Sequence, residues 1–336
     1  MNHKIFKYEE EFTLQYGGSL AQIELSYSTL GNLNANRDNV IWVCHALTAN
    51  SDVADWWSGL IGEGKLYDPK KHFIISVNVL GSHYGSTGPL SINPATGKPY
   101  YGSFPKTSIR DIARSLILLR KELGIEKINT LIGGSIGGQQ ALEWAIIEPE
   151  KIQNLVVIAS NAKHSPWGVA FNETQRLAIA TDRTWGQENP EAGIQGMKTA
   201  RAVALLSYRN YKTYQATQEG KSESGALKAS AYQKYQGEKL AKRFNAYSYW
   251  TLSVAMDNHD VSAERGSLQE ALGSIKAKTL VVGLSSDILF PVEESRLIAS
   301  HISEGTYAEI GSLYGHDGFL IETPALTEVI SKHFNQ

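Results

Sequence analysis

The spacing of apolar residues along the chain changes near residue 40. Before that point apolar and polar positions alternate within residues 6–8, 12–16 and 23–27. A period of two is typical of strands that expose one face to solvent and bury the other. The beginning of the chain is therefore predicted to form half-exposed antiparallel strands.

From Val40 onward the apolar positions form nearly continuous short runs instead. Uninterrupted runs of this kind are typical of strands that are buried on both faces of a parallel sheet. The predicted strands are 40–44, 73–77, 128–132 and 155–158, followed much later by 279–283 and 306–310.

A helical period separates these runs. Between Ser108 and Leu123 the apolar residues fall on one helical face, Ser108 and Asp111 supply a start signal, and Gly124 supplies a stop. A further helix is predicted at 324–333. Strands that alternate with helices in this way predict a doubly wound α/β sheet, mostly parallel, with helices on both faces.

The alternation is interrupted between residues 161 and 265. This stretch is rich in helix formers, aromatic residues and charges, includes the helical pattern of 228–243, and contains no convincing strand. We interpret it as a helical cap inserted over the carboxyl edge of the sheet, so that residues 1–160 and 266–336 form the core and 161–265 the cap. Within the cap, the polar segment 220–230 is expected to be a mobile loop.

Charge and composition narrow the function classes. The chain has 32 basic and 34 acidic residues and a formal net charge of -2, which gives no electrostatic reason to expect nucleic acid or an anionic membrane as partner. Cys44 is the only cysteine, which excludes an internal disulfide and a cysteine-based metal cluster, and no metal is expected. The beginning of the chain has no signal-peptide pattern, and no run approaches the roughly twenty apolar residues of a membrane span. A cytoplasmic location is expected by default.

The strongest chemical signal is the segment 133–137, which reads Gly-Gly-Ser-Ile-Gly. It follows a predicted strand and precedes a helical pattern, the context in which a strained turn lifts a serine hydroxyl clear of the sheet. Ser135 is therefore the candidate nucleophile, and the backbone amide of Ile136 a candidate donor to an oxyanion. The alternative is a glycine-rich turn with a purely structural role.

A serine hydroxyl needs a base to accept its proton and a third group to orient that base. His316 lies between the last predicted strand and the last helix, where this architecture delivers its base. His45, His83 and His164 also lie near predicted sheet edges, so position alone leaves the choice open.

Asp287 follows the predicted strand 279–283 and is the candidate orienting carboxylate. An aspartate in such a loop more commonly caps a turn or a helix. The order Ser135, Asp287, His316, each beyond the carboxyl end of a different strand, favours the catalytic interpretation.

A tetrahedral intermediate also needs a second amide donor, which this architecture takes from the loop after an earlier strand. The segment His45-Ala46-Leu47-Thr48 follows the strand 40–44, and the amide of Leu47 is the candidate. For His45 we prefer the role of a buried histidine that fixes this loop by hydrogen bonding.

Several segments together resemble the homoserine O-acetyltransferase family of α/β-hydrolase-fold acyltransferases, and the resemblance covers nearly the whole chain. The segments are HALT from His45, VLGSHYGSTGPLSINPATGKPYYGSFP from Val79, IGGSIGGQQALEWA from Ile132, FNETQR from Phe171, YQGEKL from Tyr235 and GHDGFLIE from Gly315. The resemblance implies an α/β-hydrolase fold with a helical cap, and the catalytic residues Ser135, Asp287 and His316.

The resemblance also implies a reaction. Acetyl-CoA, as co-substrate, would acylate Ser135, and the hydroxyl of L-homoserine, deprotonated by His316, would then take the acetyl group in a ping-pong sequence that serves methionine biosynthesis. Arg201 and Tyr208 match the family segment that contacts the acceptor, and Asp317 matches its amine-binding acid. An arginine suits the carboxylate of an amino acid because it binds in a bidentate manner. No tightly bound cofactor is implied, and a homodimer through cap helices is expected.

Departures from the family pattern leave alternatives open. Ile136 and Gln139 stand where methionines are usual, His83 where a cysteine is frequent, and Ala49-Asn50 where Gly-Asp is usual. Succinyl-CoA as donor or L-serine as acceptor would use nearly the same framework. A carboxyl-ester hydrolase would use the same three residues without needing Arg201 or Asp317. A binding protein without catalytic activity would have no need for Ser135, Asp287 and His316 together.

Overall fold

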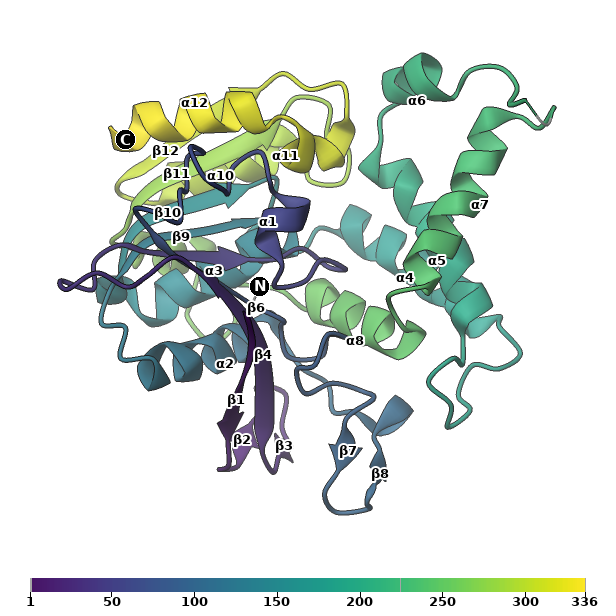
Figure 1. Ribbon diagram of the computed structural model, residues 1–336, viewed down its shortest axis with the longest axis horizontal. Helices are drawn as coiled ribbons and strands as arrows, with labels where there is room; N and C mark the ends of the chain where they lie inside the picture. Colours follow the sequence, from purple (N-terminus) through teal and green to yellow (C-terminus); the bar gives the residue numbers. More distant parts are fainter. Residues whose placement is uncertain (1, 224, 336) are drawn as a thin grey trace.

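The computed structural model describes residues 2–223 and 225–335, and an eight-stranded sheet forms its centre (Figure 1). The strand order is β1-β4-β6-β5-β9-β10-β11-β12, in which β4 pairs antiparallel with β1 and β6 while all other pairs are parallel. The sheet therefore confirms the predicted, mostly parallel architecture. Its strands are β1 (Asn2–Tyr8), β4 (Ile23–Leu30), β5 (Val40–Cys44), β6 (Phe73–Val77), β9 (Ile128–Gly134), β10 (Ile152–Ile158), β11 (Lys278–Leu284) and β12 (Gly305–Ile310).

Alternate residues of the central strands enter two separate hydrophobic cores. In β10, Leu155 and Val157 pack into one core, and Val156 and Ile158 into the other. Burial on both faces explains the continuous apolar runs in the sequence. The first core is covered by α2 (Ile109–Glu122), α3 (Ile136–Ile147), α9 (Leu268–Gly273) and α10 (Val292–His301), and the second by α1 (Val53–Trp56), α11 (Gly318–Ile321) and α12 (Thr323–Phe334).

The predicted helix after residue 108 is α2, and its ends follow the expected chemistry. The Ser108 hydroxyl accepts the Asp111 amide at 3.0 Å, and the Asp111 carboxylate accepts the Ser108 amide at 3.0 Å. Gly124 follows the helix with φ +61°, a conformation that favours glycine.

The beginning of the chain agrees only in part with its prediction. The strands β1 and β4 pair antiparallel as expected. The segment 12–16, however, contributes only β2 (Phe12–Thr13), which pairs with β3 (Ser19–Leu20). The Gln15 amide turns away to the buried Asp111 carboxylate at 3.0 Å, and two glycines with positive φ follow, so the extended pairing ends there. Two further short strands, β7 (Ile92–Asn93) and β8 (Lys98–Pro99), form a separate hairpin.

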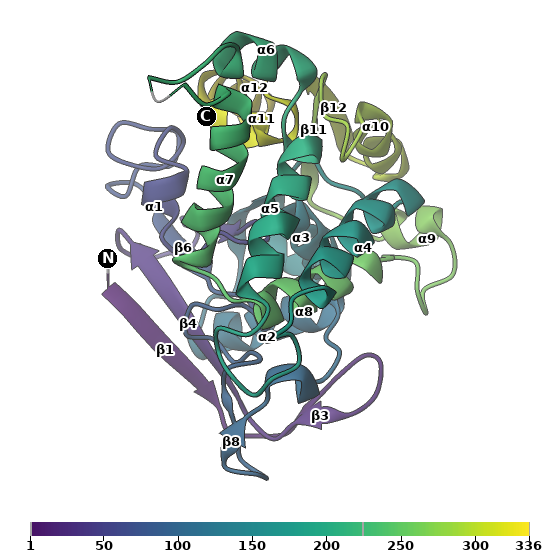
Figure 2. The ribbon, with the colours of Figure 1, turned by 90° about the vertical axis from the view of Figure 1, so that its right-hand side faces the viewer.

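The long segment without strand signals folds into helices that lie beyond one end of the parallel strands (Figures 1 and 2). Of the polar segment 220–230, residues 228–230 belong to a helix rather than a loop, residues 221 and 227 form an isolated bridge, and residue 224 lies outside the described residues. The helices are α4 (Pro166–Ala180), α5 (Ile194–Tyr208), α6 (Tyr211–Gln218), α7 (Lys228–Ala241) and α8 (Ala246–Asp257). Within the described ranges, no helix is both long enough and apolar enough to cross a membrane.

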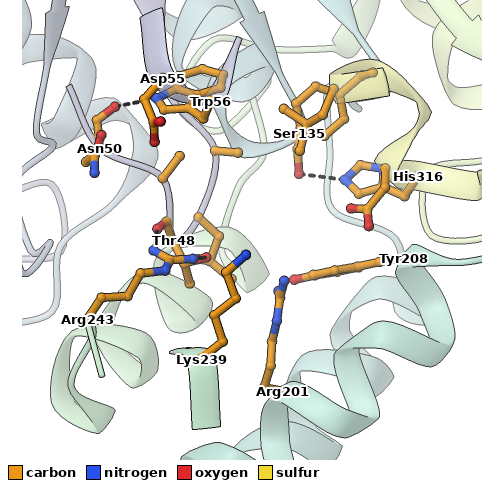
Figure 3. A pocket seen from close by; sticks show the side chains of 16 residues that line it. Thr48, Asn50, Asp55, Trp56, Ser135, Arg201, Tyr208, Lys239, Arg243 and His316 are labelled. Carbon is orange, nitrogen blue, oxygen red and sulfur yellow. Dashed lines mark hydrogen bonds between the residues drawn. The ribbon is translucent and has the colours of Figure 1, made fainter. Parts of the chain in front are cut away.

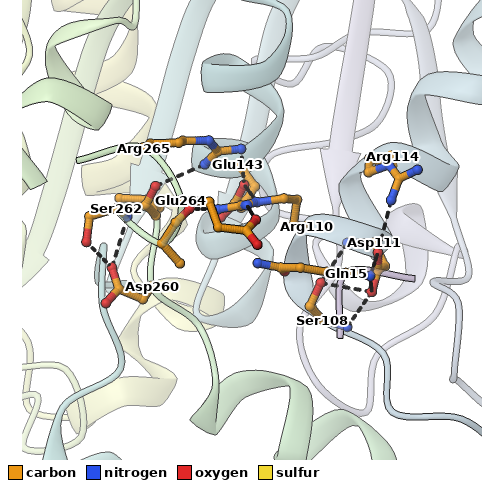
Figure 4. Close-up of polar contacts among 12 residues, drawn as sticks. Gln15, Ser108, Arg110, Asp111, Arg114, Glu143, Asp260, Ser262, Glu264 and Arg265 are labelled. Carbon is orange, nitrogen blue, oxygen red and sulfur yellow. Dashed lines mark hydrogen bonds and ion pairs between the residues drawn. The ribbon is translucent and has the colours of Figure 1, made fainter. Parts of the chain in front are cut away.

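A buried ion-pair network fixes residues 263–265, which belong to the return segment that leads from these helices back to the sheet (Figure 4). Glu143 on α3 is 2% exposed and binds Arg110 of α2 at 3.2 Å and Arg265 at 2.8 Å. Arg110 also donates to the Ala263 carbonyl at 2.7 Å and to Glu264 at 2.9 Å. The network joins the return segment to α2 and to α3, the helix that begins beside Ser135.

Candidate active site

Ser135 occupies a sharp bend between β9 and α3. Its φ of 59° and ψ of −130° are strained for a residue with a side chain, as the sequence motif predicts. The flanking glycines are needed because there is no room for a side chain. A Cβ on Gly133 would lie 2.3 Å from the Gly137 carbonyl group, and a Cβ on Gly137 would lie 2.2 Å from the Cys44 carbonyl oxygen.

The structure brings Ser135, His316 and Asp287 together from three separate strand ends. The Ser135 hydroxyl lies 2.9 Å from Nε2 of His316, and Nδ1 of His316 lies 2.7 Å from Oδ2 of Asp287. None of the three is more than 6% exposed. The carboxylate fixes the tautomer in which Nδ1 carries the proton, so Nε2 is free to accept the proton of the serine hydroxyl.

The Asp287 carboxylate is itself held in place. Its Oδ1 accepts the amides of Leu289 and Phe290 at 2.8 and 2.9 Å, which leaves Oδ2 for the imidazole. On the next loop, the amide of Gly315 donates to the Ser286 hydroxyl at 3.0 Å and so fixes the segment that carries His316. The three candidate groups are preorganised before any substrate binds.

The other histidines that position left open are used elsewhere. Nε2 of His45 accepts the Val79 amide at 3.1 Å, and Nδ1 donates to the Ala46 carbonyl at 2.8 Å. Burial lowers the pKa of His45 to about 4, so the ring stays neutral and fixes the loop, as preferred from the sequence. His83 contacts the Asn245 amide group at 2.8 Å, and burial lowers the pKa of His164 to about 4.

Two backbone amides beside Ser135 are available as oxyanion donors. Leu47 lies second in a turn closed by the Ala49 amide and the Ala46 carbonyl at 3.0 Å, a position whose own amide the turn does not use. Ile136 is the first residue of α3 and has no carbonyl one turn before it within the helix. Among the described residues no acceptor is found for either amide.

A cavity of about 340 Å³ opens above Ser135 and His316 (Figure 3). The walls come from the loop after β5, from α1, from α5 and α7, and from the segment around His316. The lining residues are Ala46, Leu47, Thr48, Ala49, Asn50, Asp55, Trp56, Ser135, Arg201, Tyr208, Lys239, Arg243, His316, Asp317, Phe319 and Leu320.

All three predicted acceptor-binding residues line this cavity. The Arg201 guanidinium lies 5.3 Å from the Tyr208 ring centroid, and the Tyr208 ring lies 5.7 Å from that of His316. Burial raises the pKa of Tyr208, so its hydroxyl stays protonated. Asp317 is already paired, because Nε of Arg209 lies 2.8 Å from its Oδ2. Sequence reasoning did not anticipate this pair.

Two further cations in the cavity wall were also missed. Lys239 lies on α7 and Arg243 two residues beyond its last residue, and both line the cavity. The motif at Tyr235 contains Lys239 and was the signal that could have nominated that residue. No group of three or more potential metal ligands gathers anywhere in 2–223 or 225–335.

Comparisons with known proteins agree with the fold and show the family. Residues 39–323 match the family model for the alpha/beta hydrolase fold. A homoserine O-acetyltransferase of Cyclobacterium marinum is 54% identical over 335 residues, which cover 99% of this chain and 95% of that protein. The crystal structure of homoserine O-acetyltransferase from Bacillus anthracis is 25% identical with a TM-score of 0.92, covering 100% of this chain and 98% of that one. The structure of esterase E22 is 24% identical with a TM-score of 0.89, covers 99% of each chain, and supports the fold alone.

Proposed function

The chain belongs to the homoserine O-acetyltransferase family of α/β-hydrolase-fold acyltransferases, and on that premise we propose that it transfers the acetyl group of acetyl-CoA to the hydroxyl of L-homoserine. The observation that carries the proposal is the hydrogen-bonded series Ser135, His316 and Asp287, which lies at a cavity that also contains Arg201. An acyltransferase for an amino acid needs both features, since one performs the chemistry and the other holds the acceptor.

The first half of the reaction acylates Ser135. His316 accepts the serine proton at Nε2 as the serine oxygen attacks the thioester carbonyl, and the amides of Leu47 and Ile136 bind the resulting oxyanion. The carbon–sulfur bond then breaks, and His316 returns the proton to the sulfur of the departing CoA. The acetyl group remains on Ser135 as an ester.

The second half transfers the acetyl group to the acceptor. His316 takes the proton of the L-homoserine hydroxyl, whose oxygen attacks the acetyl ester through a second oxyanion held by the same two amides. The bond to Ser135 breaks, and His316 gives its proton to the serine oxygen. Because CoA leaves before the acceptor reacts, the sequence is ping-pong.

The cavity offers complementary groups for an amino acid. We assign the carboxylate of the acceptor to Arg201, whose side chain forms no ion pair with any described residue. Oδ2 of Asp317 faces Arg209, so Oδ1 is the oxygen we assign to the ammonium group. Tyr208 lies between Arg201 and His316 and would orient the acceptor hydroxyl towards the base.

A role in methionine biosynthesis, a cytoplasmic location and a homodimer remain part of this proposal, and its support is the family to which the chain belongs. No bound cofactor or metal takes part in the proposed steps. The cap assignment, residues 161–265, is supported by the helices α4 to α8 and by the contribution of α5 to the cavity wall.

The main competing function is ester hydrolysis, in which water takes the place of the acceptor. The same three residues support it, and an esterase shares the fold. Thiol release should be measured for acetyl-CoA and succinyl-CoA, each with L-homoserine, with L-serine and with no acceptor. The proposal predicts sustained release over many turnovers only for acetyl-CoA with L-homoserine, a single equivalent of thiol per chain from acetyl-CoA alone, and none from the Ser135→Ala variant. Sustained release without any acceptor would favour hydrolysis.

A further inference from the structure

The loop that carries the Leu47 amide is fixed to the core on one side. His45 joins the start of the loop to Val79, as described above, and the side-chain amide of Gln140 on α3 donates to the His45 carbonyl at 3.1 Å. These contacts hold the chain up to Ala46. They do not reach Leu47 or Thr48, the two central residues of the turn.

The contacts to Thr48 come from the core residue Tyr84, whose hydroxyl donates to the Thr48 carbonyl at 3.4 Å, and from the cap side. One nitrogen of the Arg243 guanidinium, Nη1, donates to the Thr48 carbonyl and to the Tyr84 hydroxyl, the latter at 2.6 Å. The other, Nη2, donates to the Thr48 hydroxyl at 3.3 Å. Figure 3 shows Arg243 reaching from the end of α7 to Thr48 at the cavity wall. The two nitrogens thus bind the carbonyl and the hydroxyl of the residue that follows Leu47.

Arg243 is well placed to act as a fixed support because its neighbours are fixed too. The Phe244 ring packs against Tyr84 with centroids 5.7 Å apart and against His83 at 5.9 Å. Asn245 contacts His83 at 2.8 Å and caps α8. Three consecutive residues therefore join the segment between α7 and α8 to the core loops that face the cavity.

The partners of Arg243 are all uncharged. A carbonyl and two hydroxyl groups receive its hydrogen bonds, and among the described residues no carboxylate lies within ion-pairing distance of it. An arginine used only to neutralise an acid would have a carboxylate partner. The planar guanidinium instead serves as a two-nitrogen support for a backbone turn.

We propose that Arg243 is a positioning residue for the oxyanion site: it holds the Ala46–Ala49 turn so that the Leu47 amide stays directed at the oxygen of the carbonyl group that Ser135 attacks. The inference rests on the proposed function, because it assumes that Ser135 is acylated. On this inference the cap contributes to the oxyanion site as well as to the binding of the acceptor. Removal of one oxyanion donor costs about a hundredfold to a thousandfold in rate, so a donor that is loosened rather than removed should cost about tenfold to a hundredfold.

A neutral ester separates positioning from substrate binding. With p-nitrophenyl acetate, which has no anionic group for an arginine to bind, the burst of p-nitrophenolate reports the acylation of Ser135 directly. We expect the Arg243→Met variant to be acylated about tenfold to a hundredfold more slowly, with its ester affinity unchanged. Arg243→Lys, which keeps the charge but loses the second nitrogen, should remain about tenfold slow. Lys242→Met, the matched control, removes an exposed charge from the adjacent position and should behave as wild type.

The outcomes are distinct. A wild-type chain without a Ser135-dependent burst would overturn the proposed function itself. A normal wild-type burst together with normal acylation of Arg243→Met would overturn only the role of Arg243. Full recovery by lysine would also overturn it, because charge alone would then suffice. If Arg243→Met does not fold, Thr48→Val tests the same contact by removing the hydroxyl to which Nη2 of Arg243 donates; we expect a loss of about threefold to tenfold, and an unchanged rate would contradict the proposal.

Discussion

Replacing Asp287 by asparagine tests how the structure sets the tautomer of His316. Oδ1 of Asp287 accepts two backbone amides, from Leu289 and Phe290, so the carbonyl oxygen of an asparagine must take that position. Its NH2 group would then face Nδ1 of His316 in place of Oδ2. A donor at that point forces Nδ1 to be the acceptor and moves the ring proton to Nε2.

With the proton on Nε2, the imidazole donates to the Ser135 hydroxyl and can no longer accept its proton. Serine enzymes with this change lose about 10⁴-fold in kcat, which corresponds to about 5 kcal/mol of transition-state stabilisation. We therefore expect Asp287→Asn to release thiol from acetyl-CoA about 10⁴-fold more slowly at pH 7. Its thermal midpoint should change little, since the two backbone hydrogen bonds persist.

The assay is a stopped-flow measurement of thiol release in the presence of L-homoserine. Asp38→Asn, the same change on an exposed turn outside the cavity, is the matched control and should keep full activity. A rate for Asp287→Asn within tenfold of wild type would refute the argument that this carboxylate sets the tautomer of the base.

Three further predictions follow from individual contacts. Arg201→Lys should raise KM for L-homoserine about 10- to 100-fold and leave the acylation burst unchanged, because only the bidentate contact to the acceptor is lost; an equal loss in the burst would contradict the assignment. Glu143→Gln should lower the free energy of unfolding in urea by about 3 kcal/mol, because it leaves two largely buried arginines without their shared carboxylate, and an unchanged midpoint would contradict this. Burial lowers the pKa of His45 and His164 to about 4 and of His259 to about 3, so below pH 6.5 the unfolded chain binds more protons than the folded chain. The free energy of unfolding should therefore fall by about 2 kcal/mol per histidine between pH 7 and pH 5. Equal urea midpoints at the two pH values would argue against this prediction.

Much of the sheet could be predicted because its central strands are buried on both faces. The segments 40–44 and 73–77 are strands over the predicted residues, because a short uninterrupted apolar run is typical of a strand that is buried on both faces. The segment 12–16 misled the prediction because its alternation is real but its backbone bonds elsewhere, the Gln15 amide going to Asp111. Periodicity records which side chains are buried and says nothing about where the backbone amides find partners.

The site shows the same division. The meeting of Ser135, His316 and Asp287 could be predicted because their loops follow parallel strands of one sheet, whose carboxyl ends lie along one edge. Two other contacts could not be predicted from the sequence: the ion pair of Arg209 with Asp317 and the hydrogen bonds of Arg243 to Thr48. Both join the helical insertion to core loops far away in the sequence, and their geometry depends on how the insertion packs.

The central claim is that the acetyl group passes through Ser135, and intact-protein mass spectrometry tests it most directly. Mixed with acetyl-CoA and no acceptor, the chain should gain one acetyl group, which peptide fragmentation locates on Ser135 and which L-homoserine then removes. The Ser135→Ala variant should gain none. Rapid turnover of both substrates without any acetyl group on Ser135, under conditions that quench the reaction at once, would contradict the account.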